Sequence, residues 1–102
     1  MAVLLRLVQR FHHARKAEFM ELEKQFAELE HRGILPKGER YAPISGREPG
    51  NTVVWQCRFE NLAAVDAAIK LFQTEPGHAG LAEKQGPLFQ DSWVELYEVL
   101  DF

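Results

Sequence analysis

Hydrophobic and polar residues alternate along several segments of the chain, and this alternation predicts four β-strands. It is clearest over residues 2–12, 52–59 and 92–100, where apolar side chains recur at every second position, as in a strand with one buried face. A weaker segment spans residues 40–47 and contains Pro43. Because proline donates no hydrogen bond to a neighbouring strand, this segment is expected at an edge of the sheet.

Two segments between these strands have the periodicity of amphipathic helices. Residues 14–32 carry apolar side chains at steps of three and four, and a second helix with the same spacing follows Asn61, a favourable N-cap. Glu75-Pro-Gly77 is expected to end the second helix, and residues 78–85 are predicted to add a short helical turn. The two apolar stripes are Phe19, Leu22, Phe26 and Leu29, and Leu62, Val65, Ile69 and Phe72.

Charged residues dominate the rest of the first helix. We expect this acidic surface to be a face in contact with solvent, because charged side chains are seldom buried. Its members are Glu18, Glu21, Glu23, Lys24, Glu28 and Glu30.

The order of elements, strand-helix-strand-strand-helix-strand, predicts one ferredoxin-like α+β domain over residues 1–102. In this sandwich both helices cover one face of a four-stranded antiparallel sheet, and the other face is left open. The open face is predicted to carry Leu4, Arg6, Val8, Arg10, Tyr41, Val54, Gln56, Arg58, Trp93, Glu95, Tyr97 and Val99. This mixture of apolar and charged groups is typical of an interface or a ligand cleft.

Composition narrows the function. The 102 residues have a net charge of −3, which disfavours nucleic acid as a partner. An RNA-recognition module has the same element order but stacks bases on aromatic residues of the open face, whereas Trp55 and Phe59 are predicted to face the helices. A single cysteine, Cys57, excludes an internal disulfide and is expected in the core. With no signal peptide and no membrane span in the sequence, we expect a cytoplasmic protein.

Three stretches resemble the dimeric α+β-barrel superfamily, which includes antibiotic-biosynthesis monooxygenase-like and NIPSNAP-like proteins. They are the strand-to-helix segment Val53–Leu62, the break Glu75–Gly77 and the closing strand Ser92–Leu100. The resemblance implies a homodimer in which two sheets pair face to face, with a cavity beside the helices or the dimer seam. We expect no cofactor and no metal in this chain. The Asn, Trp and His set of haem-degrading relatives is not placed here, because Asn51 and Asn61 fit a turn and a cap.

Three functions remain open from the sequence. The first is binding of a small aromatic or anionic ligand, the second a cofactor-independent monooxygenase or isomerase, and the third a purely structural dimer. The candidate ligand-binding residues are Arg6, Tyr41, Arg58, Trp93, Tyr97 and His78. Arginine offers a planar fork of donors to an anion, and the aromatic rings offer stacking surfaces. The alternative for the arginines is pairing with Glu95, and for the rings it is a dimer core.

Overall fold

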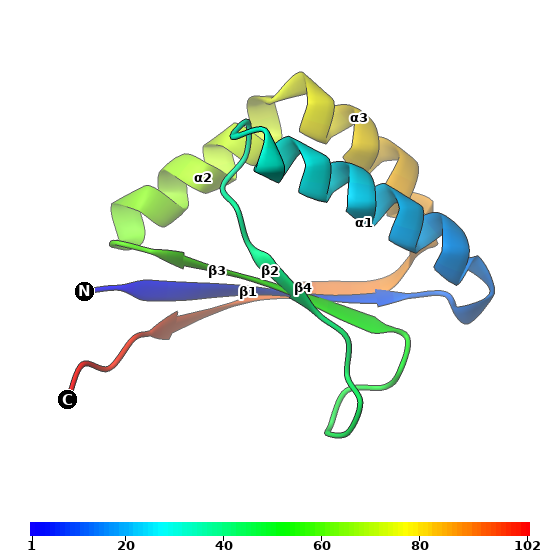
Figure 1. Ribbon diagram of the computed structural model, residues 1–102, viewed down its shortest axis with the longest axis horizontal. Helices are drawn as coiled ribbons and strands as arrows, with labels where there is room; N and C mark the ends of the chain where they lie inside the picture. The colour runs from blue at the N-terminus through cyan, green and yellow to red at the C-terminus, as the bar shows by residue number, and fades with distance from the viewer.

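A computed structural model describes all of residues 1–102 and shows a four-stranded sheet with a layer of helices on one face (Figure 1). The strand order is β2-β3-β1-β4, and every neighbouring pair is antiparallel. This is the predicted ferredoxin-like α+β sandwich. The strands are β1 (Val3–Phe11), β2 (Glu39–Tyr41), β3 (Thr52–Phe59) and β4 (Phe89–Glu98), and the helices are α1 (Lys16–His31), α2 (Leu62–Thr74) and α3 (Pro76–Gln85).

The core lies between the sheet and the helices, as the alternation predicts. In the pairing of β1 with β3, Leu5 is opposite Cys57 and Leu7 is opposite Trp55, so the apolar sides of both strands share one face. Two clusters fill this layer. One contains Val3, Leu5, Trp55, Cys57 and Val65, and the other contains Phe11, Phe19, Val53 and Leu88. The prediction that Cys57 is buried is therefore confirmed.

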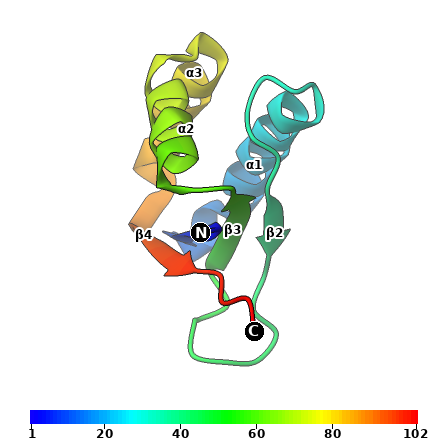
Figure 2. The same ribbon diagram turned by 90° about the vertical axis from the view of Figure 1, so that its left-hand side faces the viewer.

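The edge strand β2 is much shorter than predicted. It occupies the expected edge position but ends at Tyr41, and residues 42–51 form a loop on the open side of the sheet (Figures 1 and 2). Pro43 cannot continue the ladder, which accounts for the early end of the strand. An ion pair of 3.0 Å between Arg10 Nη2 and Glu48 Oε2 ties this loop to β1.

The helical layer has one more full helix than the predicted pattern. Asn61 caps α2 as expected, accepting a hydrogen bond of 2.8 Å from the Ala64 amide. The predicted turn at residues 78–85 is instead the ten-residue helix α3, which begins at Pro76. The Glu75 carboxylate caps it by accepting from the Gly77 amide at 2.9 Å. Proline at the first helical position is favourable because its missing amide needs no partner there.

The acidic face of α1 is not uniformly solvated, and for two residues the prediction is wrong. Glu23 and Glu30 are buried together with Phe19 and Phe26 on the side of α1 that faces the sheet. These four residues follow one another at steps of four, three and four, which places them on a single helical stripe. Burying two carboxylates requires partners, and these come from the sheet and from α3.

Candidate functional site

A buried ion-pair network joins the first helix to the edge strand. Arg40 lies in the middle of β2, opposite Trp55 and on the helix side of the sheet. Its Nε donates to Glu23 Oε2 at 2.6 Å, and its Nη2 donates to Glu30 Oε2 at 2.7 Å. Burial opposes the charge of Arg40, but its hydrogen bonds to Glu30 and Glu23 outweigh that effect and raise its pKa.

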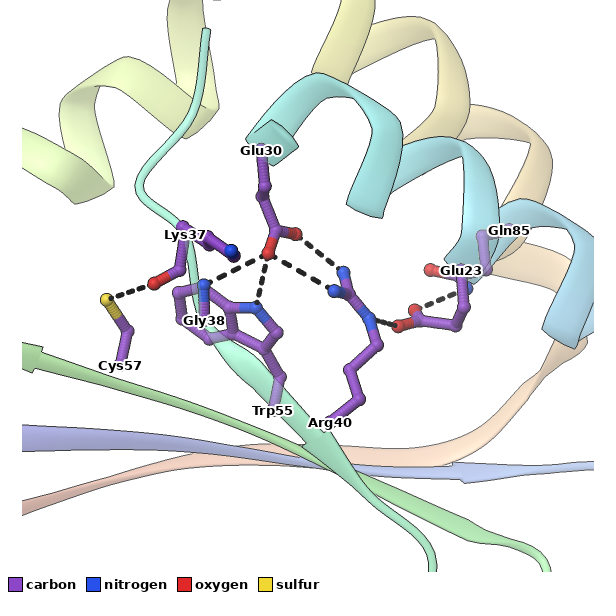
Figure 3. Close-up of polar contacts among 8 residues, drawn as sticks. All are labelled: Glu23, Glu30, Lys37, Gly38, Arg40, Trp55, Cys57 and Gln85. Atoms are coloured by element: carbon purple, nitrogen blue, oxygen red, sulfur yellow. Dashed lines mark hydrogen bonds and ion pairs between the residues drawn. The ribbon is translucent and has the colours of Figure 1, made fainter. Parts of the chain in front are cut away.

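Further donors complete the coordination of both carboxylates (Figure 3). Glu30 Oε1 accepts from the Gly38 amide at 3.0 Å, from Arg40 Nη1 at 3.2 Å and from the Trp55 indole at 3.2 Å. Glu23 Oε1 accepts from Gln85 Nε2 on α3 at 2.8 Å. The position of Gly38 is tight, because a side chain there would contact the Trp55 indole. The network therefore ties α1, α3, β2 and β3 together.

The same residues form part of the wall of a cavity of about 300 Å³ between the helices and the sheet. The rest of the wall is mainly apolar and comes chiefly from β1, α1, α2, α3 and β4. Its apolar members include Leu5, Leu7, Phe26, Phe72, Phe89 and Val94. Val94 is 56% exposed although it faces the helix side, because β4 is an edge strand that the helices do not fully cover. The cavity is thus accessible along β4, and it is large enough for a small ligand.

His78 is the one predicted site residue that lines this cavity. His78 lies in the first turn of α3. The centroid of its ring is 5.1 Å from that of Phe26 and 5.1 Å from that of Phe72. Its Nδ1 is buried and has no hydrogen-bond partner. Burial lowers the pKa of His78, against the opposing influence of the Phe72 backbone and of Glu75 and Glu30. The neutral imidazole is therefore the favoured form in the folded protein.

Gln9 is a cavity residue that the sequence reasoning missed. It is 3% exposed, lines the cavity from near the C-terminal end of β1, and its Nε2 is buried with no partner. A signal was present, because Gln9 is the only polar side chain among the odd-numbered residues of β1, which otherwise form an apolar face. The other missed residues, Glu23 and Glu30, had a comparable signal in their spacing from Phe19 and Phe26.

Most of the other predicted site residues gather on the opposite face of the sheet, around Glu95. Arg6 Nη1 and the Tyr97 hydroxyl both donate to Glu95 Oε1 at 2.9 Å. The Trp93 indole donates to Glu95 Oε2 at 3.0 Å. Hydrogen bonds from Trp93 and Tyr97, together with Arg6, lower the pKa of Glu95. These polar groups are therefore hydrogen-bonded to one another. For Arg6 this is the pairing with Glu95 that the sequence left open as the alternative to ligand binding.

Tyr41 and Arg58 lie away from this cluster. Tyr41 lines an open groove of about 420 Å³ with Arg6, Gln56 and the loop of residues 42–48. Arg58 is exposed near the end of β3 and lines neither this groove nor the cavity. The structure therefore brings Arg6, Tyr41, Trp93 and Tyr97 to one face and places His78 on the other, so the six residues do not line a single cleft. Their roles in ligand binding stay predictions.

Two classes of feature are absent from the structure. No group of three or more histidine, cysteine, aspartate or glutamate side chains is arranged to hold a metal ion. None of the helices combines the length and the apolar character that crossing a membrane requires.

Comparison with solved structures shows the same fold in proteins of very different sequence. A NIPSNAP family protein from Agrobacterium tumefaciens has a TM-score of 0.84 at 13% identity, covering 99% of this chain and 88% of its own. A NIPSNAP domain protein from Burkholderia xenovorans has a TM-score of 0.77 at 17% identity, covering 100% and 97%. The predicted resemblance to NIPSNAP-like proteins is thus confirmed for the fold.

A third similar structure comes from another bacterium. A protein of unknown function from Bacteroides fragilis, described as dimeric and as having a ferredoxin-like fold, has a TM-score of 0.64 at 18% identity and covers 96% of each chain. No protein-family model and no curated protein matches the chain. At these identities the likeness establishes the fold alone, and function has to be argued from the site.

The buried network predicts a large effect of replacing Arg40 with methionine. Arg40→Met leaves two buried carboxylates without their cation and is expected to lower the free energy of unfolding by about 3–5 kcal/mol at pH 7.5. The pKa of an uncompensated buried carboxyl rises, so the folded variant binds more protons than the unfolded chain, and the loss should shrink at pH 5. Urea denaturation at both pH values measures this change.

The matched control is Arg15→Met. Arg15 Nη2 lies 2.7 Å from Glu18 Oε2, and both side chains are exposed at the N-terminus of α1. Removal of this ion pair is expected to leave the unfolding midpoint unchanged within error. Equal effects of the two substitutions would contradict the structural role assigned to the network.

Proposed function

We propose that the protein is a homodimeric binding protein for a small, mainly apolar or aromatic molecule, held in the cavity between the helices and the sheet. The cavity itself is the observation that carries this proposal. It has a volume of about 300 Å³, ten of its seventeen lining residues are hydrophobic, and it is open along β4. Cavities of this size and character, with a few polar groups in the wall, are typical of small-molecule sites.

The wall of the cavity suits an aromatic ring. Phe26, Phe72 and the imidazole of His78 present ring surfaces to it, and ring pairs in offset or edge contact are favourable. Burial of a ring there removes apolar surface of both partners from water. An apolar cavity of this volume also differs from the groove on the open face, where only three of ten lining residues are hydrophobic.

Binding of 2-naphthol, measured by isothermal titration calorimetry, tests the cavity as the site. Ala82 lines the cavity on α3, so Ala82→Leu is expected to fill part of it and weaken binding about tenfold or more, equivalent to about 1.4 kcal/mol. Ala79→Leu is the matched control, because Ala79 is also exposed on α3 and lies outside the cavity. Absence of binding to the wild type, or equal loss in both variants, would overturn the proposal.

A second candidate function, proton-transfer chemistry without a cofactor, is favoured by His78. Its unpartnered Nδ1 and the lowered pKa that burial causes leave a neutral imidazole in the cavity wall. A neutral imidazole next to a bound substrate is suited to accept a proton as a general base. This is the first step required of an isomerase, and of a monooxygenase that acts on a phenolic substrate.

Deuterium exchange into a ketone tests this chemistry. In D₂O, removal of a proton from the acetyl methyl group of 2-acetylnaphthalene forms an enolate that returns as a deuterated methyl group, and ¹H NMR follows the loss of signal. We expect acceleration by about 10²–10⁴ over buffer and its loss in His78→Gln. The rate should be constant at neutral pH and fall only at a pH below the usual histidine pKa of about 6.5, because burial lowers the pKa of His78. Binding without acceleration would leave the protein a binding protein only.

The open face of the sheet supports the homodimer. Tyr97 is 47% exposed at the centre of the cluster around Glu95, and Trp93, Leu4 and Tyr41 extend the same face. An exposed surface of aromatic residues with internally paired charges is typical of interface cores, where aromatic residues and arginine are enriched. A face-to-face dimer would leave the cavity of each subunit free on the outer, helix-covered side.

Light scattering coupled to size exclusion at micromolar concentration tests the dimer. The wild type is expected to elute with twice the mass of the chain, whereas Tyr97→Lys introduces an uncompensated charge at the interface and should produce monomers. Leu62→Lys is the control, since Leu62 is 51% exposed at the start of α2 on the other side of the molecule. A monomeric wild type would refute the dimer. A dimer that binds none of the aromatic probes would instead favour the purely structural module.

A further inference from the structure

The cavity contains two kinds of polar group, and the difference between them points to the ligand. The polar groups of the network all have partners within the chain. All three guanidinium nitrogens of Arg40 donate to Glu23 or Glu30, the Gln85 amide donates to Glu23, and the Trp55 indole donates to Glu30. Each of these groups already has a carboxylate partner within the chain.

Gln9 is the opposite case. Its side chain is nine-tenths or more buried, lies on the cavity wall and has a buried Nε2 without any partner. Its neighbours across the sheet are Val53 and Ser92, and neither supplies an acceptor. A buried donor without a partner destabilises the folded protein, so its presence in β1 indicates an acceptor that comes from outside the chain.

The charges around the cavity limit what that acceptor can be. Two carboxylates, Glu23 and Glu30, and one guanidinium, Arg40, are the only charged side chains in the wall, so the wall is negative by one unit. An anionic ligand would lose its hydration and meet repulsion at low dielectric. The positive charge of Arg40 does not offset this repulsion, because its guanidinium is already paired with Glu23 and Glu30.

We propose that Gln9 is a specificity-determining residue for a neutral aromatic or apolar ligand that carries a hydrogen-bond-accepting oxygen, such as a carbonyl, and that the Glu23–Arg40–Glu30 wall excludes the corresponding anions. This rests on the proposed function and deepens it. Of the two ligand classes that the sequence leaves open, aromatic and anionic, it selects the neutral aromatic one. The Gln9 amide binds the oxygen of the ligand, and the apolar wall binds its body.

Two probes of similar shape and different charge test the exclusion of anions. 2-Acetylnaphthalene is neutral and carries a carbonyl oxygen, and 2-naphthoate has a carboxylate in the same place. Calorimetry at pH 7.5 is expected to show the neutral ketone binding at least about tenfold more tightly. Glu23→Gln removes one unit of negative charge from the wall and should reduce this preference by about threefold or more, mainly by strengthening the binding of 2-naphthoate.

Gln9→Leu tests the hydrogen bond. It keeps the size of the side chain and removes the amide, so 2-acetylnaphthalene should bind about three- to tenfold more weakly. The ligand-free variant should have a higher melting temperature than the wild type, since an unsatisfied buried donor has been removed. A side chain with only a structural role would produce a lower melting temperature. Gln73→Leu, on the exposed surface of α2 and outside the cavity, is the control and should alter neither quantity.

The outcomes separate this inference from the proposed function. If neither naphthalene probe binds to the wild type, the proposed function fails. If both bind with equal affinity, and Gln9→Leu binds the ketone as tightly as the wild type does, the cavity is a ligand site but the specificity inference is wrong. A preference for 2-naphthoate over the ketone would also overturn it.

Discussion

The ion pairs of Arg40 with Glu23 and Glu30 are the constraint on which the rest of this structure depends. A strand of three residues at a sheet edge has few hydrogen bonds of its own, and Arg40 attaches β2 to α1 through contacts of 2.6 and 2.7 Å. Desolvation of two carboxylates is unfavourable, and it is offset only because every carboxylate oxygen receives at least one donor. The network therefore requires α1, α3, β2 and β3 to adopt one relative placement.

This constraint also explains why a cavity lies beside the core. Polar side chains that must satisfy one another adopt the geometry of their hydrogen bonds and cannot rearrange to fill space as aliphatic side chains do. The apolar clusters pack on either side of this region, around Trp55 and around Phe19. Between them, the network forms part of a cavity wall. The feature that determines the placement of the helices thus also determines the polarity of the site.

The sequence predicts the fold well and the site only in part. The spacing of apolar residues predicts both ends of β3 correctly. It also predicts the cap at Asn61 and the burial of Cys57, because all of these depend on local sequence. It fails at Glu23 and Glu30, where residue type suggests solvent but spacing from Phe19 and Phe26 indicates the core. The partner that makes their burial possible is Arg40, in a strand too short to show alternation. His78 could be singled out from its place after a turn, but its ring neighbours come from two separate helices.

The contrast between the two faces of the sheet is the strongest argument for different roles. Arg6 and Gln9 belong to the same strand and point to opposite faces, yet Arg6 has partners in Gln56 and Glu95 whereas Gln9 Nε2 has none. On the open face the cluster around Glu95 is satisfied, although the buried Arg10 Nε and Thr52 Oγ1 have no partner. A satisfied cluster is suited to pack against another protein surface, since little is lost on desolvation. A buried face with a free donor and a free imidazole nitrogen gains most from a ligand that supplies the missing partners. Gln9 Nε2 and His78 Nδ1 line the cavity, whereas Arg10 Nε and Thr52 Oγ1 line neither the cavity nor the groove. Unpartnered polar atoms in a cavity wall, more than residue type, therefore indicate the binding site in this protein.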